Sequence, residues 1–213
     1  MSTILDTIGD TPLVRLTRCA PANGAELWLK LECRNPTGSL KDRMALAMIE
    51  GAEREGALAP GETVVEYTGG STGPALAFVC SAKGYRCLIV IADCFTEERF
   101  QHGVFIQAHE PAGSAAISGG TAGSFAIQGW TGIVMPHWDA ERVDHIEPVE
   151  DEDSLAMTLR LSQEEGIFAG ISTGANVVGA HRLAERLGPE AVIVTLAVDS
   201  GFKYMSVPPY VDL

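Results

Sequence analysis

A lysine in the stretch NPTGSLKDR, residues 35–43, stands between a glycine-containing turn and an Asp-Arg pair. Ser39 has the residue type of a helix N-cap, so Lys41 is expected in the first turn of a helix. The helix dipole disfavours a cation there, and a partly buried place of that kind lowers the pKa of a lysine. Such an amine forms imines with carbonyl compounds, which would make Lys41 a nucleophile. The alternative is a solvated surface lysine, with Asp42 and Arg43 as further surface charges, and the stretch alone favours it.

The stretch TGGSTG, residues 68–73, joins an expected strand to an expected helix. Backbone N–H groups in such a turn are available to an anion, and the helix dipole adds partial positive charge. The glycines let a ligand approach closely, and Thr68, Ser71 and Thr72 add hydroxyl donors. The stretch is therefore interpreted as an anion site, with a tight turn as the alternative. It is not a Walker loop, because no Gly-Lys-Ser/Thr follows.

A third candidate is the stretch DSG, residues 199–201, which ends an expected strand with the hydroxyl of Ser200. Taken alone, this stretch is more typical of a turn and helix cap than of a binding site. Its importance depends on which other residues the fold brings close to it.

The elements that must position these residues follow an α/β order. Residues 39–93 predict a helix, a strand, a helix and a strand, which is the pattern of a parallel sheet with right-handed crossovers. A glycine- and serine-rich loop, residues 112–130, is expected to lie on a site or an interface. Asp151 or Asp153 is expected to cap the helix that follows it. The expected strands cover residues 11–16, 25–32, 62–68, 85–93, 103–111 and 191–201, the expected helices cover 40–56, 74–84 and 154–166, and residues 167–188 are expected to form a turn and then a helix.

The composition argues against several classes of partner. The net charge of −13 disfavours nucleic acid and anionic membranes. The chain has no apolar run long enough for a membrane-spanning helix and no signal-peptide pattern at its start, so a cytoplasmic location is expected. Five cysteines without a CxxC pair indicate free thiols in a reducing compartment, and the histidine spacing predicts no metal site.

Several motifs occur together in one order along the chain. These are ILDTIGDTPLVRL, NPTGSLKDR, TGGSTGPALAFVCSAKGY, EPAGS…SGG…IQGW, EEGIFAGISTGA and DSGFKYMS. In this order they resemble the cysteine synthase branch of the fold-type-II pyridoxal-phosphate (PLP) enzymes, which includes O-acetylserine sulfhydrylases and cystathionine beta-synthases. The resemblance implies an α/β fold like that of the tryptophan synthase beta subunit, with parallel sheets, helices on both faces and, in this chain, a truncated small domain.

The resemblance also implies roles for single residues. Lys41 carries PLP as a Schiff base and removes the α-proton of the substrate. Ser200 makes a hydrogen bond at the pyridine nitrogen, and a neutral serine there favours β-elimination. Ser71 stands where the family usually has an asparagine that contacts the cofactor. The remaining implied residues are Gly170 beside the cofactor ring and Thr68, Gly69, Thr72 and Gln128 for the substrate.

The implied reaction is β-replacement or β-elimination on a small amino acid. O-acetylserine or a similar compound loses its leaving group, and sulfide or another thiol adds to give cysteine. The implied partners are therefore the amino-acid substrate and the sulfur donor, and family members are commonly homodimers.

A large block of the family pattern is missing between residues 100 and 101, roughly a hundred residues by the resemblance. It includes the loop that binds the PLP phosphate, and SGGTAG, residues 118–123, is a weak candidate to replace that loop. The expected parts are N-terminal strands (1–38), a remnant of the small domain (39–100) and a large PLP-binding domain (101–213). The missing block leaves an alternative open: a catalytically impaired relative that acts as a binding or regulatory module. An unrelated α/β nucleotide-binding domain is a third reading, which the ordered motifs disfavour.

Overall fold

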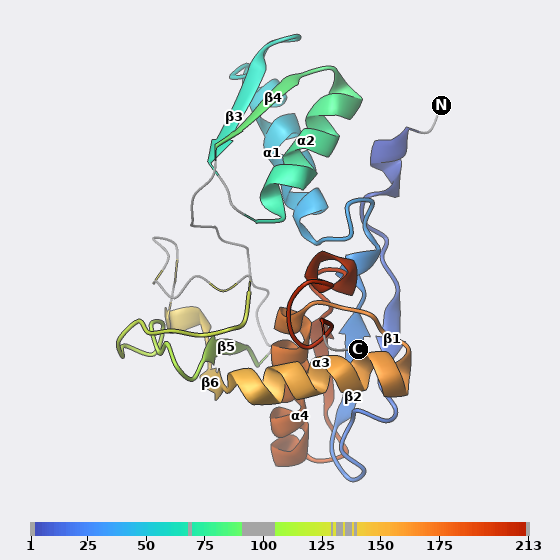
Figure 1. Ribbon diagram of the computed structural model, residues 1–213, viewed down its shortest axis with the longest axis vertical. Helices are drawn as coiled ribbons and strands as arrows, with labels where there is room; N and C mark the ends of the chain where they lie inside the picture. The colour runs from blue at the N-terminus through green and yellow to red at the C-terminus, as the bar shows by residue number, and fades with distance from the viewer. Residues whose placement is uncertain are drawn as a thin grey trace. The chain divides into compact units, whose positions relative to one another are not determined.

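The computed structural model describes residues 3–67, 70–90, 105–128, 130, 134, 138 and 140–211. The implied substrate residues Thr68 and Gly69 lie outside this part of the chain. Contacts divide the chain into two compact units (Figure 1). Unit 1 contains Met1–Pro12, Leu31–Asp93 and Val198–Ser200, and unit 2 contains Leu13–Lys30, Cys94–Ala197 and Gly201–Leu213.

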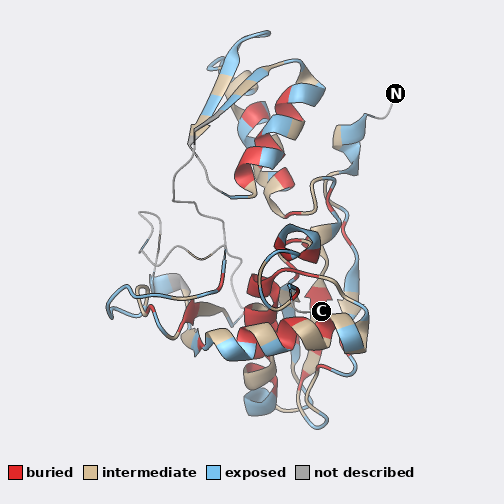
Figure 2. Ribbon diagram, viewed as in Figure 1, coloured by how far each residue is buried: buried red, intermediate tan, exposed pale blue. Residues whose placement is uncertain are grey.

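Unit 1 is a two-stranded parallel sheet with a pair of helices. Strand β3 pairs with β4, and helix α2 contacts both strands and packs against α1. Its core contains Ala45 and Ile49 from α1 and Leu76 and Val79 from α2, and Figure 2 shows buried residues where the two helices face each other. The elements are η1 (Ile4–Thr7), η2 (Glu32–Arg34), α1 (Lys41–Glu55), β3 (Thr63–Tyr67), α2 (Thr72–Lys83) and β4 (Arg86–Val90).

Helix α1 differs from the sequence prediction in its first residue and in its buried face. The N-cap position is Leu40, and the Ser39 hydroxyl instead accepts a hydrogen bond from the backbone N–H of Lys41 at 3.2 Å. The apolar spacing predicts that Met48 shares a face with Met44, but Met48 is exposed and the buried face contains Asp42. The spacing of apolar residues does not reveal the buried face of α1, because one of its members is the carboxylate residue Asp42.

Unit 2 contains a three-stranded sheet, a separate parallel pair of strands and two long helices. In the first sheet β1 is antiparallel to β2, and β2 is parallel to β7. In the second, β5 is parallel to β6. Helix α4 contacts strands of both sheets and packs along α3. The elements are β1 (Leu13–Arg15), β2 (Glu26–Lys30), β5 (Gln107–Pro111), η3 (Ala140–Arg142), β6 (His145–Val149), α3 (Asp151–Glu165), α4 (Ile171–Leu187), β7 (Val192–Leu196) and η4 (Gly201–Tyr204).

The helices α3 and α4 approach closely at Gly174. A Cβ atom on Gly174 would lie 2.2 Å from the carbonyl oxygen of Ser154 and 2.2 Å from the hydroxyl of Thr158. Real Cβ contacts are never so short, so the crossing of the two helices requires glycine at this position.

Two predictions for unit 2 are wrong. The sequence reading places no strand at His145–Val149, because its acidic residues indicate a solvated helix start. Helix α3 begins at Asp151 after an N-cap position at Glu150, so Asp151 and Asp153 occupy the first turn and do not cap it. Both carboxylates still lie where the helix dipole favours negative charge.

The two units are built from alternating segments of the chain. The strands β1 and β2 belong to unit 2, whereas residues on either side of them belong to unit 1. The expected domains 1–38, 39–100 and 101–213 are consecutive, and their boundaries stay a prediction.

Candidate active site

The lysine-bearing turn, residues 35–43, pairs with the segment that follows β7. The Leu40 N–H donates to the Val198 carbonyl at 3.0 Å, and Ser39 and Asp199 form an antiparallel bridge. The Ser200 N–H donates to the Gly38 carbonyl at 2.9 Å. Three backbone contacts in a row therefore bring Lys41 and Ser200, which are far apart in the sequence, into one part of unit 1.

Gly38 is required for this pairing. Its φ angle of +74° lies in the left-handed region that favours glycine. A Cβ atom built on Gly38 would lie 3.3 Å from the Cβ atom of Ser200, which is tighter than most real contacts. A larger residue at position 38 would therefore strain the turn and push Ser200 away from it.

Asp42 fixes the turn from inside. The sequence prediction that Asp42 is a surface charge is wrong, because its side chain is fully buried. Its carboxylate accepts hydrogen bonds from the Thr37 backbone N–H at 2.7 Å and from the Thr37 hydroxyl. A charged acceptor of this kind binds more strongly than a neutral one, so Asp42 holds the residues just before Lys41 in one conformation.

A second buried carboxylate, that of Glu32, fixes the other side of the turn. Arg43 donates to both of its oxygens, at 2.7 and 3.0 Å, and Thr11 donates at 2.6 Å. Asn35 donates to Glu32 at 2.9 Å and accepts from the Gly9 N–H at 2.8 Å. We call these residues the Glu32 cluster. Sequence reasoning missed it, because Glu32 and Thr11 are far from the lysine along the chain.

The protonation of Glu32 is set by its partners. Burial acts to raise the pKa of the carboxyl, but hydrogen bonds from Arg43, Thr11 and Asn35 outweigh burial and hold the pKa below its ordinary value. Glu32 is therefore a carboxylate at neutral pH. Its negative charge is what makes the double contact with Arg43 strong.

The described part of the TGGSTG stretch forms the start of α2 in unit 1. Ser71 occupies the N-cap position and is half-buried, and Thr72 begins the helix with its side chain buried. Helix α2 packs on α1, which begins at Lys41. The implied carboxylate-binding stretch and the lysine therefore lie at the first turns of two packed helices.

Two of the implied residues belong to unit 2. Gly170 is buried at the N-cap position of α4, where its carbonyl accepts a hydrogen bond from the Thr173 N–H at 3.0 Å. Gln128 is exposed in a turn. Their roles beside the cofactor and the substrate stay predictions.

The SGGTAG stretch does not have the contacts of a phosphate-binding loop. Glu110 lies buried beneath the residues that lead into it, and its carboxylate accepts hydrogen bonds from the N–H groups of Ile117 at 3.0 Å and Ser118 at 3.3 Å. The N–H of Gly120 donates to the Ala115 carbonyl. The N–H groups of Ile117 and Ser118 thus already serve the Glu110 carboxylate, whose charge repels a phosphate dianion.

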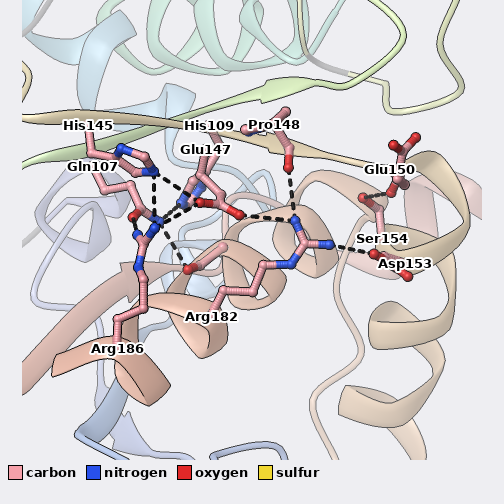
Figure 3. A network of polar contacts seen from close by, with 11 residues as sticks. Gln107, His109, His145, Glu147, Pro148, Glu150, Asp153, Ser154, Arg182 and Arg186 are labelled. Carbon is pink, nitrogen blue, oxygen red and sulfur yellow. Dashed lines mark hydrogen bonds and ion pairs between the residues drawn. The ribbon is translucent and has the colours of Figure 1, made fainter. Parts of the chain in front are cut away.

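Unit 2 has a polar cluster of its own around Glu147 on β6 (Figure 3). Arg182 on α4 donates to Glu147 at 3.1 Å and to Asp153 of α3 at 2.6 Å. Arg186, one turn further along α4, donates to Gln107 of β5 at 2.7 Å. Every one of these contacts joins one element to another, so the cluster connects α3 and α4 to the β5–β6 sheet.

Two cysteines among the described residues, Cys19 and Cys80, are buried thiols. Cys19, Cys33, Cys80 and Cys87 are free, and burial raises the pKa of Cys19 and of Cys80 to about 11. A thiol with such a pKa stays protonated and unreactive at neutral pH. In the described residues, no three acidic, histidine or cysteine side chains gather as metal ligands, and no helix has the length and apolarity to cross a membrane.

Comparison with known proteins gives a family match. The sequence model described as "Pyridoxal-phosphate dependent enzyme" matches this chain in two stretches, residues 4–103 and 96–199. Together the stretches cover most of the chain. They meet at residues 96–103, where the resemblance places the missing block.

Individual relatives agree with this match. The cysteine synthase of Staphylococcus aureus is 31% identical over 298 residues, covering 97% of this chain and 96% of that protein. The cysteine synthase B of Escherichia coli is 31% identical over 289 residues, covering 97% and 95%. A crystal structure of an O-ureido-L-serine synthase superimposes with a TM-score of 0.86 at 28% identity, covering 98% of this chain and 94% of that one. Because the first alignment spans 298 residues and this chain has 213, a part of the relative has no counterpart here.

Proposed function

Because the chain belongs to the family of pyridoxal-phosphate dependent enzymes, we propose that it catalyses β-replacement or β-elimination on O-acetylserine or a similar small amino acid, with sulfide or a thiol as the incoming group. The family match confirms three predictions from the sequence: the cysteine synthase-like resemblance, the α/β fold class and PLP as the cofactor. The substrate and the sulfur donor are proposals.

The geometry of unit 1 supports Lys41 as the residue that holds the cofactor. Lys41 is the first residue of helix α1. Ser39 and Asp42 make hydrogen bonds that fix the start of this helix, and Gly38, just before it, accepts a hydrogen bond from the Ser200 N–H. The residues proposed for the two ends of the cofactor ring therefore belong to one hydrogen-bonded stretch. This pairing is the observation that carries the proposal.

Each proposed residue has a separate task. When bound, PLP supplies an electron sink for the negative charge that develops as the Cα–H bond breaks. We assign the removal of that proton to Lys41 Nζ and a hydrogen bond at the ring nitrogen to the Ser200 hydroxyl. Ser71 is assigned to the cofactor edge. The start of α2, with Thr72, suits the substrate carboxylate because a helix N-terminus favours an anion.

Four further assignments belong to the same proposal. Gly170 is proposed beside the cofactor ring, and Thr68, Gly69 and Gln128 are proposed for the substrate. The free cysteines agree with the proposed cytoplasmic location, since disulfides are rare in reducing compartments. A homodimer is the assembly proposed from the resemblance.

A second candidate function is that of a shortened relative with impaired catalysis. Two observations favour it: part of the relatives has no counterpart in this chain, and the N–H donors leading into SGGTAG bind Glu110. A PLP phosphate needs several such donors. Without them the covalent bond to Lys41 would carry most of the cofactor affinity.

Reductive trapping tests the proposal. The purified chain is incubated with PLP at micromolar to millimolar concentrations, reduced with borohydride and digested, and the labelled lysine is found by mass spectrometry. We expect the label on Lys41, its loss in Lys41→Ala, and its retention in Lys83→Ala, where the lysine is half-buried and pairs with Glu53 at 2.8 Å.

The two candidate functions then separate by activity. O-acetylserine-dependent consumption of sulfide that disappears in Lys41→Ala supports the enzyme. Label on Lys41 with no turnover supports the impaired relative. Absence of label at Lys41 at millimolar PLP contradicts both the covalent bond between Lys41 and the cofactor and the proton removal assigned to Lys41.

A further inference from the structure

The three-stranded sheet of unit 2 has two unlike faces. Leu27 and Leu29 of β2 and Ile193 of β7 point to one face and are buried. Trp28 and Lys30 of β2 alternate with them and point to the other face, which we call the outer face. By register it also contains Leu13 and Arg15 of β1, Glu26 of β2, and Val192, Val194 and Leu196 of β7.

The outer face is apolar and exposed. The exposed fractions are 63% for Val192, 59% for Val194, 42% for Leu196 and 47% for Leu13. Strands joined in parallel are normally covered on both faces, and a group of exposed aliphatic side chains of this kind marks an interaction site. The relatives have residues without counterparts in this chain, so this chain has fewer elements with which to cover the sheet.

The charges on the outer face indicate what covers it. Glu26 and Lys30 stand at the two ends of β2, with Trp28 midway between them. If a second copy lies face to face with its strands antiparallel, Glu26 of each copy comes opposite Lys30 of the other. The same surface is therefore complementary to itself, as an interface with two-fold symmetry requires.

The remaining charge on the face agrees with this arrangement. Within one copy, Glu26 forms an ion pair with Arg15 at 3.0 Å and accepts a hydrogen bond from the indole N–H of Trp28 at 3.0 Å. Arg15, Glu26 and Lys30 together carry a net charge of +1, in a chain whose net charge is −13. The face therefore carries none of the chain's excess negative charge.

We propose that the outer face of the β1–β2–β7 sheet is the interface between two copies of this chain. Its centre is formed by Trp28 and Val194, and Glu26 and Lys30 set the antiparallel orientation. The proposal gives a surface to the homodimer and does not depend on the proposed catalysis.

Sedimentation velocity across a range of protein concentrations, with circular dichroism to check folding, tests the interface. We expect a dimer in the unaltered chain and a dissociation constant raised at least about 100-fold in Val194→Glu, because a buried charge without a partner is costly. The matched control is Val65→Glu in unit 1, where Val65 is 60% exposed and the dimer should be unchanged.

A charge exchange tests the orientation. Glu26→Lys should weaken the dimer, and adding Lys30→Glu in the same chain should restore it, since each copy then again offers opposite charges. A monomer at every concentration would overturn both the interface and the homodimer. A dimer that survives Val194→Glu in a folded chain, or that the double exchange does not restore, would overturn this interface and leave the homodimer standing.

Discussion

The lysine turn (residues 35–43) and the outer face of the β1–β2–β7 sheet differ in how many of their groups find partners within the chain. In the turn, the buried carboxylates of Asp42 and Glu32 each accept several hydrogen bonds from residues of the same unit. On the outer face, Val192 and Val194 remain more than half exposed. The buried carboxylates of the turn are hydrogen-bonded within one chain. The apolar side chains of the outer face would be covered only in the proposed dimer.

The difference has a cause in sequence distance. Thr37 and Asp42 are five residues apart, and Arg43 and Glu32 are eleven residues apart, so part of the hydrogen bonding of both buried carboxylates comes from residues 32–43. A sheet face, in contrast, is covered by elements from distant parts of a chain. The contacts within residues 32–43 do not depend on the part of the relatives that has no counterpart in this chain.

The same substitution in the two regions should give the largest contrast. We expect Glu32→Ala to lower the free energy of unfolding by about 3 kcal/mol, because it leaves the donors of Arg43, Thr11 and Asn35 without their carboxylate. Glu26→Ala on the outer face should cost at most about 1 kcal/mol, since its ion-pair partner Arg15 is exposed and both Glu26 and its other partner, Trp28, are only partly buried. Urea unfolding at a concentration where the chain is monomeric measures both.

Glu32→Gln is the matched control for shape. It keeps the size of the side chain and removes its charge, so its free energy of unfolding should lie between those of the unaltered chain and of Glu32→Ala. Equal losses for Glu32→Ala and Glu26→Ala would contradict the contrast between the two regions.

A smaller effect is expected from pH. The folded-state pKa of Glu32 lies below its ordinary value of about 4.5, so the folded state binds the proton less readily than the unfolded state. Its contribution to stability is present in full above that ordinary value and is lost as the pH falls through the lowered folded-state pKa. Unfolding measured from pH 6 downward should show less acid dependence in Glu32→Gln. An unchanged pH profile in this variant would show that Glu32 does not contribute.

The smallest effect is expected on the outer face itself. Val192→Thr keeps a β-branched side chain at an exposed strand position, so the stability of the monomer should change by less than about 0.5 kcal/mol. Leu27→Ala on the opposite face of the same sheet should cost about 3 kcal/mol, because Leu27 is fully buried. Thermal unfolding of the two variants side by side compares the faces, and similar losses would contradict the assignment of an exposed face.

Much of the fold follows from local patterns. Gly84 ends α2 in the left-handed conformation expected of a terminal glycine, and the alternation over residues 39–93 correctly predicts the parallel pair β3–β4. The sequence does not predict strand β6, because the acidic stretch that begins at Glu147 resembles a solvated helix start and His145, Glu147 and Pro148 are poor strand formers. Their place is set by pairing with β5 and by Arg182 of α4, and neither contact is visible in a local window.

The sequence by itself determined the family, because the ordered motifs around Lys41, Ser71, Gly170 and Ser200 are short stretches whose residue types and order can be recognised without coordinates. Only the tertiary structure decided which charged side chains are buried and which groups they bind. It buried Asp42, gathered Thr11 and Arg43 on Glu32, and gave the donors leading into SGGTAG to Glu110. The physical reason is that burial and hydrogen-bond partnership depend on groups from separate segments meeting in space, and residue type and local spacing do not record those meetings.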